Sequence, residues 1–154
     1  MNGILVVDME RCTGCKLCEI VCSVKKEGVS DPARSRIRIT IQRGGKNRLP
    51  TFCQHCEEPL CAAVCPVNAV RKDESTGLIL LDRELCVGCR ACVSACPLFG
   101  VGFDSVENKA LRCDLCHGDP ACVKYCEAGA IQYVDRDQFP TNKQRAAAKK
   151  LYSP

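Results

Sequence analysis

The chain has 154 residues, of which 16 are Cys, four are Phe, three are Tyr and none is Trp. With so few large aromatic side chains, a chain of this length relies on cross-links or metal centres for its stability. The formal charge is +4, but no aromatic residues are interleaved with the basic ones, and no apolar run approaches a membrane span, so we expect neither nucleic-acid binding nor membrane insertion.

The first predicted element is a short strand over residues 4–7, which read Ile-Leu-Val-Val. The residues around it lack the positive start, the longer apolar stretch and the small-residue cleavage site of a secretory signal. We therefore expect a protein of the reducing, anaerobic cytoplasm, which argues against a secreted disulfide framework.

Beyond this strand, the cysteines form four groups of four with no remainder. In chain order they are Cys12, Cys15, Cys18 and Cys22; Cys53, Cys56, Cys61 and Cys65; Cys86, Cys89, Cys92 and Cys96; and Cys113, Cys116, Cys122 and Cys126. The third group has the C-x2-C-x2-C-x3-C-P spacing of bacterial ferredoxins, and the second differs from it only in a longer loop before its third Cys.

Three uses of these cysteines compete: disulfides, zinc and iron–sulfur clusters. Zinc usually takes two ligands from each of two separated loops, so a third Cys three residues after the second is surplus for zinc. Thiols this crowded have no evident unique disulfide pairing. Three thiolates of one tight loop can instead reach three irons of a cubane, so we predict four [4Fe–4S] clusters, with a zinc-binding adaptor as the alternative.

Two histidines lie inside the cysteine loops, His55 in the second group and His117 in the fourth. Histidine replaces Cys as an iron ligand in some centres. Because every group already has four thiolates, we expect neither histidine to bind iron. A role in modulating cluster potentials by hydrogen bonding stays open.

Residues 34–52 are predicted to be a β-hairpin inserted between the first two groups. Residues 36–41 alternate Arg or Thr with Ile, and Gly44 and Gly45 follow as a turn signal. We expect Ile to face inward and Arg outward. The hairpin is either an edge strand protected by charge or a basic docking strip for a partner.

The segment between the second and third groups predicts a short helix over 66–70, a polar turn over 72–77 and a strand over 78–82. Residues 53–107 would then form one double-cluster ferredoxin unit. We expect the fourth Cys of each group to begin a helix that carries its sulfur to the other cluster of the pair. Crossed ligation predicts set 3 (Cys53, Cys56, Cys61 and Cys96) and set 4 (Cys65, Cys86, Cys89 and Cys92).

By exclusion, residues 1–33 and 108–136 form an outer unit, closed by a predicted strand within 128–134. Its ligands are set 1 (Cys12, Cys15, Cys18 and Cys126) and set 2 (Cys22, Cys113, Cys116 and Cys122). The predicted fold is therefore α+β, with two ferredoxin units in a pseudo-twofold arrangement, one nested in the other. The tail, residues 137–154, contains good helix formers and is either an arm over a partner subunit or a frayed terminus.

The predicted function depends on the catalytic motifs that the sequence lacks and on the clusters that we expect it to hold. It has no candidate nucleophile–base pair and no glycine-rich phosphate loop, and all of its thiolates are committed to iron, so we expect no catalytic residues and no enzyme activity. Each oxidised cubane carries about −2, so four of them bring the net charge from +4 to about −4, and the Lys and Arg excess is partial compensation. Four clusters in a row have two ends, which suits a wire between two partners.

The four groups, in this order and with these loop lengths, resemble the iron–sulfur subunit family of molybdenum and tungsten oxidoreductases. That family includes the electron-transfer subunits of dimethyl sulfoxide reductase, formate dehydrogenase and related hydrogenase complexes. The resemblance covers roughly residues 1–135. It implies that all sixteen cysteines are cluster ligands and that the partner is a catalytic subunit with a molybdenum or tungsten pterin.

A narrower resemblance lies in residues 31–37, Asp-Pro-Ala-Arg-Ser-Arg-Ile, and in the short insertion. Both are similar to short subunits found with tungsten aldehyde oxidoreductases, carbon monoxide dehydrogenase and benzoyl-coenzyme A reductase systems. We favour a tungsten aldehyde oxidoreductase as the catalytic partner and a flavoprotein or ferredoxin as the second one. The alternatives are an autonomous polyferredoxin and a scaffold that self-associates head to tail into filaments.

Overall fold

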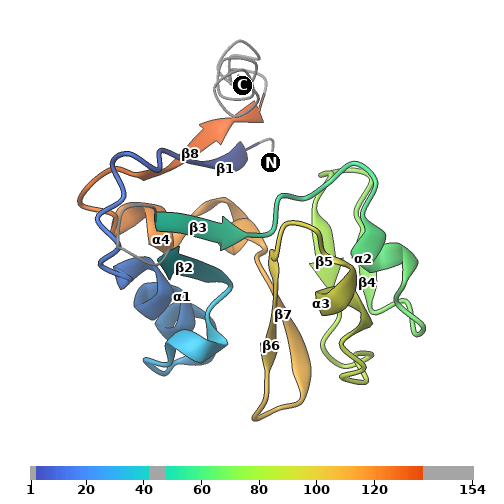
Figure 1. Cartoon of the computed structure of the whole chain (residues 1–154). Helices are drawn as coiled ribbons and strands as arrows, with labels where there is room; N and C mark the ends of the chain where they lie inside the picture. The colour runs from blue at the N-terminus through green and yellow to red at the C-terminus, as the bar shows by residue number, and fades with distance from the viewer. Residues whose placement is uncertain (1–2, 42–47, 137–154) are drawn as a thin grey trace, which may run out of the picture.

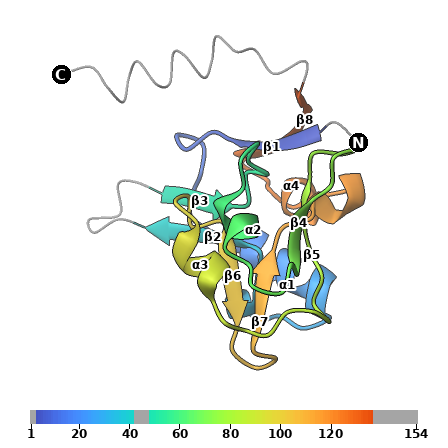
Figure 2. The same cartoon turned by 90° about the vertical axis from the view of Figure 1, so that its right-hand side faces the viewer.

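The computed structural model describes residues 3–41 and 48–136, and within these ranges the strands pair into four separate two-stranded antiparallel sheets. The pairs are β1 (Gly3–Val7) with β8 (Ile131–Asp135), β2 (Ile37–Ile41) with β3 (Arg48–Phe52), β4 (Val70–Lys72) with β5 (Ile79–Leu81), and β6 (Val101–Asp104) with β7 (Lys109–Arg112). Figures 1 and 2 agree that the β1–β8 pair lies at one end of the molecule and the β6–β7 turn at the other.

Each α-helix begins one residue before the third Cys of a group. The helices are α1 (Leu17–Glu27), α2 (Leu60–Ala63), α3 (Ala91–Ala95) and α4 (Ala121–Lys124), with 3-10 turns η1 (Pro32–Arg34) and η2 (Leu115–Gly118). The expectation that the fourth Cys begins the helix is therefore wrong. The C-x3-C spacing is about one helical turn, so a helical turn that begins beside the third Cys places the fourth one turn further on. Only α1 extends past its fourth Cys, Cys22, whereas α2, α3 and α4 end one or two residues before theirs.

The helices pack in pairs, α1 with α4 and α2 with α3, and the chain ends meet through β1 and β8. Figure 1 shows α1, α4 and the β1–β8 and β2–β3 pairs on one side, α2, α3 and the β4–β5 pair on the other, and β6–β7 between them. Two apolar cores result, and buried cysteines belong to both. No helix within the described ranges combines the length and apolar character needed to cross a bilayer.

The predicted strands over residues 4–7, 78–82 and 128–134 are confirmed as β1, β5 and β8. The predicted helix over 66–70 is wrong, because Asn68 has a φ of 51° and Val70 already belongs to β4, where it pairs with Leu81. A left-handed residue interrupts a right-handed helix, and the chain turns into a strand instead. The β6–β7 pair was not foreseen, and it spans residue 107, the predicted end of the inner unit.

The inserted hairpin forms from β2 and β3, with Ile37 and Ile39 buried as expected. Two details differ from the sequence prediction. Ile41 is exposed, and Arg36 is buried because its guanidinium pairs with Glu27 of α1. The turn glycines Gly44 and Gly45 and the predicted tail lie outside the described residues.

Candidate metal centres

Three cavities each gather one of the predicted cysteine sets. All four residues of set 1 line a cavity of about 380 Å³ between the loop after β1 and the end of α4. Sets 2 and 4 line two smaller cavities of about 20 Å³ each. In each cavity the fourth Cys comes from a different group than the other three. Ligation of clusters by these sets stays a prediction, and the convergence of four cysteines on each cavity agrees with it.

Cys53 and Cys96, which both belong to set 3, come close to each other at Gly100. The N–H of Gly100 donates to Cys96 Sγ at 3.3 Å, and a Cβ placed on Gly100 would lie 2.9 Å from Cys53 Cα. Cys53 and Cys61 are buried in the second core, and Cys96 packs against it. Cys56 is exposed at the rim. A glycine is required here because any side chain would push the Cys96 loop away from the Cys53 strand.

Every cysteine loop has a left-handed residue directly before its second Cys. These residues are Gly14 (φ 75°), His55 (φ 47°), Gly88 (φ 71°) and Leu115 (φ 56°). The left-handed backbone reverses the chain between two cysteines, so that both sulfurs turn to the same side. Glycine adopts this conformation freely, whereas His55 and Leu115 pay about 1–3 kcal/mol in strain that the surrounding fold has to offset.

Several N–H groups point at cysteine sulfurs, as metal-bound thiolates require. Backbone N–H groups of Arg36 and Leu115 donate to Cys22 and Cys113 at 3.3 and 3.5 Å. Burial alone would raise the pKa of Cys65, but backbone N–H groups of the turn that follows it outweigh this and lower the pKa. Such donors stabilise negative charge on sulfur and tune the potential of a bound cluster.

Other thiols are held neutral unless a cation replaces their protons. Burial, together with the charges of neighbouring cysteines, raises the pKa of Cys18 and of Cys122 to about 12. Burial also raises the pKa of Cys113. Because iron binding displaces these protons, a cluster would remove both the desolvation and the mutual repulsion that the thiolates would otherwise suffer.

The two loop histidines have different surroundings. His55 is buried, its Nδ1 accepts the N–H of Ile79 at 2.9 Å, and burial, together with the nearby Arg112, lowers its pKa to about 4. His117 is exposed, with its Nε2 3.8 Å from Asp114 Oδ2. His55 is therefore a neutral ring whose Nδ1 is committed to the backbone.

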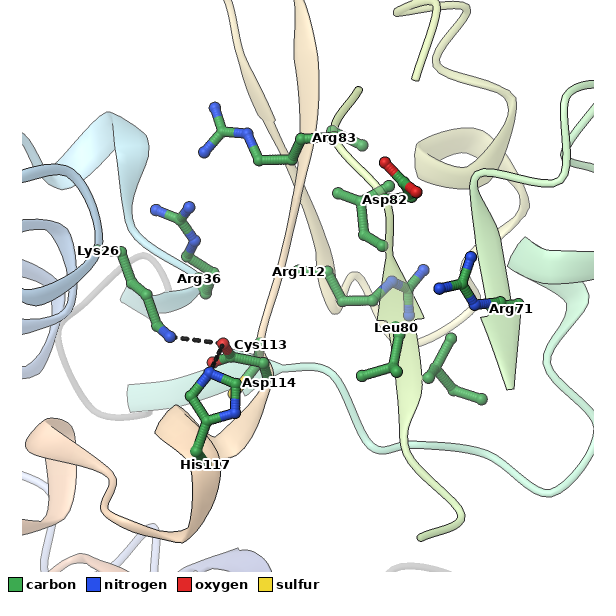
Figure 3. A pocket seen from close by; sticks show the side chains of 13 residues that line it. Lys26, Arg36, Arg71, Leu80, Asp82, Arg83, Arg112, Cys113, Asp114 and His117 are labelled. Atoms are coloured by element: carbon green, nitrogen blue, oxygen red, sulfur yellow. Dashed lines mark hydrogen bonds and ion pairs between the residues drawn. The ribbon is translucent and has the colours of Figure 1, made fainter. Parts of the chain in front are cut away.

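A pocket lined by arginines was missed in the sequence. A pocket of about 480 Å³, the basic pocket, lies between β5, β7 and the end of α1. Lys26, Arg36, Arg71, Arg83 and Arg112 line it (Figure 3) together with Asp82, Asp114 and Cys113. Lys26 pairs with Asp114 at 2.6 Å, and the Arg112 side chain extends from β7 toward the β4–β5 pair. Residues distant in sequence form this pocket, so no local motif marks it.

Two family models match the chain. A 4Fe-4S dicluster domain covers residues 46–136, and a 4Fe-4S binding domain covers residues 5–25. Together these matches include all four cysteine groups, and the segment between the two matched ranges is not covered.

Curated relatives carry related names. The polyferredoxin-like subunit of aliphatic sulfonate oxidoreductase from Pyrococcus furiosus is 40% identical, over 88% of this chain and 80% of that protein. Electron transport protein HydN of Escherichia coli K12 is 32% identical, over 96% of this chain and 98% of that one. Among solved structures, a chain of the active site complex BamBC of benzoyl coenzyme A reductase aligns with a TM-score of 0.54 and 21% identity, over 96% of each chain, which shows a shared fold.

Proposed function

We propose, from the premise that this chain belongs to the 4Fe-4S dicluster domain family, that it is the electron-transfer subunit of an oxidoreductase complex and holds four [4Fe–4S] clusters. The names of its relatives, a polyferredoxin-like subunit and an electron transport protein, support this role. The clusters supply one-electron chemistry, and the chain's own residues hold them, exclude water and adjust their potentials.

One observation carries the proposal: Cys113 packs against both apolar cores. It belongs to set 2, and the sulfurs of Cys22, Cys122 and Cys53 are near enough to act on it electrostatically. Cys53 belongs to set 3. Sets 1 and 2 are in turn linked through α1, which contains Cys18 and Cys22, and sets 3 and 4 through the packing of α2 on α3. These contacts support a continuous row of the four sets, which suits conduction from end to end.

The finer proposal concerns the arrangement and the partners. We infer two ferredoxin units, nested and related by a pseudo-twofold axis, with ligand sets 1 to 4 as defined above. The catalytic partner is a tungsten or molybdenum pterin enzyme, with a tungsten aldehyde oxidoreductase favoured, and a flavoprotein or ferredoxin exchanges electrons at the other end. The likeness to the BamBC chain supports the fold of this proposal and does not bear on the substrate.

The test is anaerobic purification of the native protein with its partners, followed by metal and sulfide analysis. We expect about sixteen iron and sixteen sulfide per chain, and tungsten or molybdenum in stoichiometric amount with a co-purifying subunit. A colourless, zinc-containing protein would overturn the cluster assignment. Recovery of a brown monomer without a partner would favour an autonomous polyferredoxin, and open chains in electron micrographs would favour the filament scaffold.

A further inference from the structure

Within the described part of the chain, three buried side-chain nitrogen or oxygen atoms have no hydrogen-bond partner, and all three lie beside the Cys53 loop. They are His55 Nε2, Arg112 Nε and Arg112 Nη2. A buried donor without an acceptor destabilises a native protein, so such atoms point to an acceptor that binds there.

Arg112 is the last residue of β7 and is only 7% exposed. Its Nη1 donates to Cys53 Sγ at 3.1 Å, and it forms no ion pair with a carboxylate among residues 3–41 and 48–136. The sulfurs of Cys53 and Cys61 stabilise its charge against burial. Its backbone is held by pairing with Val101 of β6. The guanidinium is thus a fixed, buried positive charge whose observed contact is a thiol of set 3.

His55 adds a neutral donor. Because its Nδ1 accepts the N–H of Ile79, the ring proton is assigned to Nε2, the atom that lacks a partner. The ring sits in the same loop as Cys53, and Cys53 Sγ is 3.9 Å from Nδ1.

The other sets differ from set 3 in the kind of group that donates to their sulfurs. Where the described residues donate to their sulfurs, the donors are backbone N–H groups, as for Cys22 and Cys113. Two other arginines of the basic pocket direct their charge to a carboxylate, since Arg36 and Arg83 both pair with Glu27.

We propose, resting on the ligand sets of the proposed function, that Arg112 and His55 donate N–H groups to the cluster on set 3 and make it the highest-potential cluster of the four. Reduction adds one negative charge to a cluster, and a buried positive charge with N–H donors to sulfur stabilises that reduced form. Set 3 lies inside the row, next to Cys113 of set 2. Its cluster therefore holds an electron within the row of clusters and is not the cluster that passes electrons to a partner.

The first measurement is an anaerobic redox titration followed by electron paramagnetic resonance, on wild type, Arg112→Gln, Arg112→Lys and Arg71→Gln. Arg71→Gln is the control, because it removes the same charge from an exposed position of the same pocket, and Arg71 donates to no sulfur within residues 3–41 and 48–136. We expect Arg112→Gln to make the highest-potential cluster at least ten-fold harder to reduce, about 59 mV for one electron. The shift should be smaller for set 4, because the Arg112 charge also acts on Cys92, and sets 1 and 2 should be unchanged. Arg112→Lys should give a smaller shift of the same sign.

A second measurement does not depend on the Arg112 variants keeping their clusters. Cys56→Ser alters one exposed ligand of set 3, and we expect it to change the signal that titrates at the highest potential. The proposal is overturned if Cys56→Ser changes a lower-potential signal, if Arg112→Gln retains its clusters and leaves every potential unchanged, or if Arg71→Gln gives the same shift. Fewer than four clusters in wild type would instead refute the proposed function.

Discussion

Arg34 Nε donates to Asp104 Oδ2 at 2.7 Å, joining the 3-10 turn after α1 to the end of β6, 70 residues further along the chain. The Asp104 side chain is fully buried, and its other oxygen accepts the N–H groups of Val106 and Glu107 in the β6–β7 turn. Arg34 also pairs with Glu27 of α1. The Arg34–Asp104 pair therefore ties the segment that carries three cysteines of set 1 and one of set 2 to the hairpin that carries Arg112.

Asp104→Asn should lower the thermal unfolding midpoint of the holoprotein by roughly 5 to 10 °C. Asn keeps a carbonyl oxygen for the turn, but Arg34 loses one of its two buried carboxylate partners and keeps Glu27 and the more exposed Glu107. We therefore expect the lower end of the cost of breaking a buried ion pair on one side, about 3 kcal/mol. Anaerobic circular dichroism measures the midpoint. Asp119→Asn is the control, because its pairs with Lys25 and Lys124 are exposed and should change the midpoint by less than about 2 °C. Equal effects of the two variants would contradict this interpretation.

The deficit of Asp104→Asn should be the same at pH 6, 7 and 8. Burial alone would raise the pKa of Asp104, but the N–H of Glu107 and the Arg34 side chain outweigh it, so the folded pKa lies below the usual value. A carboxyl with a lowered pKa stabilises the fold above its unfolded pKa of about 3.9, and that stability is lost only as the pH falls through the folded value. A deficit that halves between pH 8 and pH 6 would rule out Asp104 as its source.

Gly100→Ala should remove the set 3 cluster and leave the others. The new Cβ would lie 2.6 Å from Phe52 O and 2.9 Å from Cys53 Cα, both of them backbone atoms that cannot move aside cheaply. We expect about four fewer iron per chain by anaerobic iron assay. Gly28→Asn serves as the control, since nothing lies within 4 Å of its Cβ position and Asn tolerates the positive φ of 72° there. Full iron content in Gly100→Ala would count against set 3 as assigned.

Crossed ligation predicts that distant cysteines act on one cluster. Cys22→Ser and Cys116→Ser should perturb the same paramagnetic signal, and Cys15→Ser and Cys126→Ser should share a second one, because each pair belongs to one set. Each substitution should cost between about one and four iron, from loss of a corner iron to loss of the cubane. If Cys22→Ser instead shares its signal with Cys15→Ser, ligation is local to each group and sets 1 and 2 have to be redrawn.

Removal of the clusters should unfold the chain. Both apolar cores include cysteines, and the strands pair only two at a time, which is marginal for independent stability. An anaerobic chelator should therefore abolish the far-ultraviolet circular dichroism of the folded protein together with its visible absorption, and iron with sulfide should restore both. Native circular dichroism in iron-free protein would show that the thiols pack adequately by themselves.

Local structure was predictable wherever a few neighbouring residues decide it. The strand at residues 4–7 follows from a short apolar run and the β2–β3 pair from short-range alternation. The C-x3-C spacing implies a helical turn, although the helix begins one residue before the third Cys and not at the fourth. The segment after Cys65 was misjudged as a helix, because Asn68 adopts a left-handed conformation that the residue types permit but do not require. The burial of Arg36 was missed because its partner, Glu27, lies on a different element.

By itself, the sequence determined the chemistry: sixteen thiols in four groups, spaced so that each loop can reach an iron–sulfur cubane, and hence the family. Ligand spacing is a property of a few consecutive residues and survives in the linear order. The tertiary structure alone decided which charges face which thiols. Arg112 donates to Cys53, which lies 59 positions away in the sequence. The buried ring of His55 accepts the N–H of Ile79, which belongs to β5. Such contacts depend on how the elements pack, and no periodicity or motif in the chain records them.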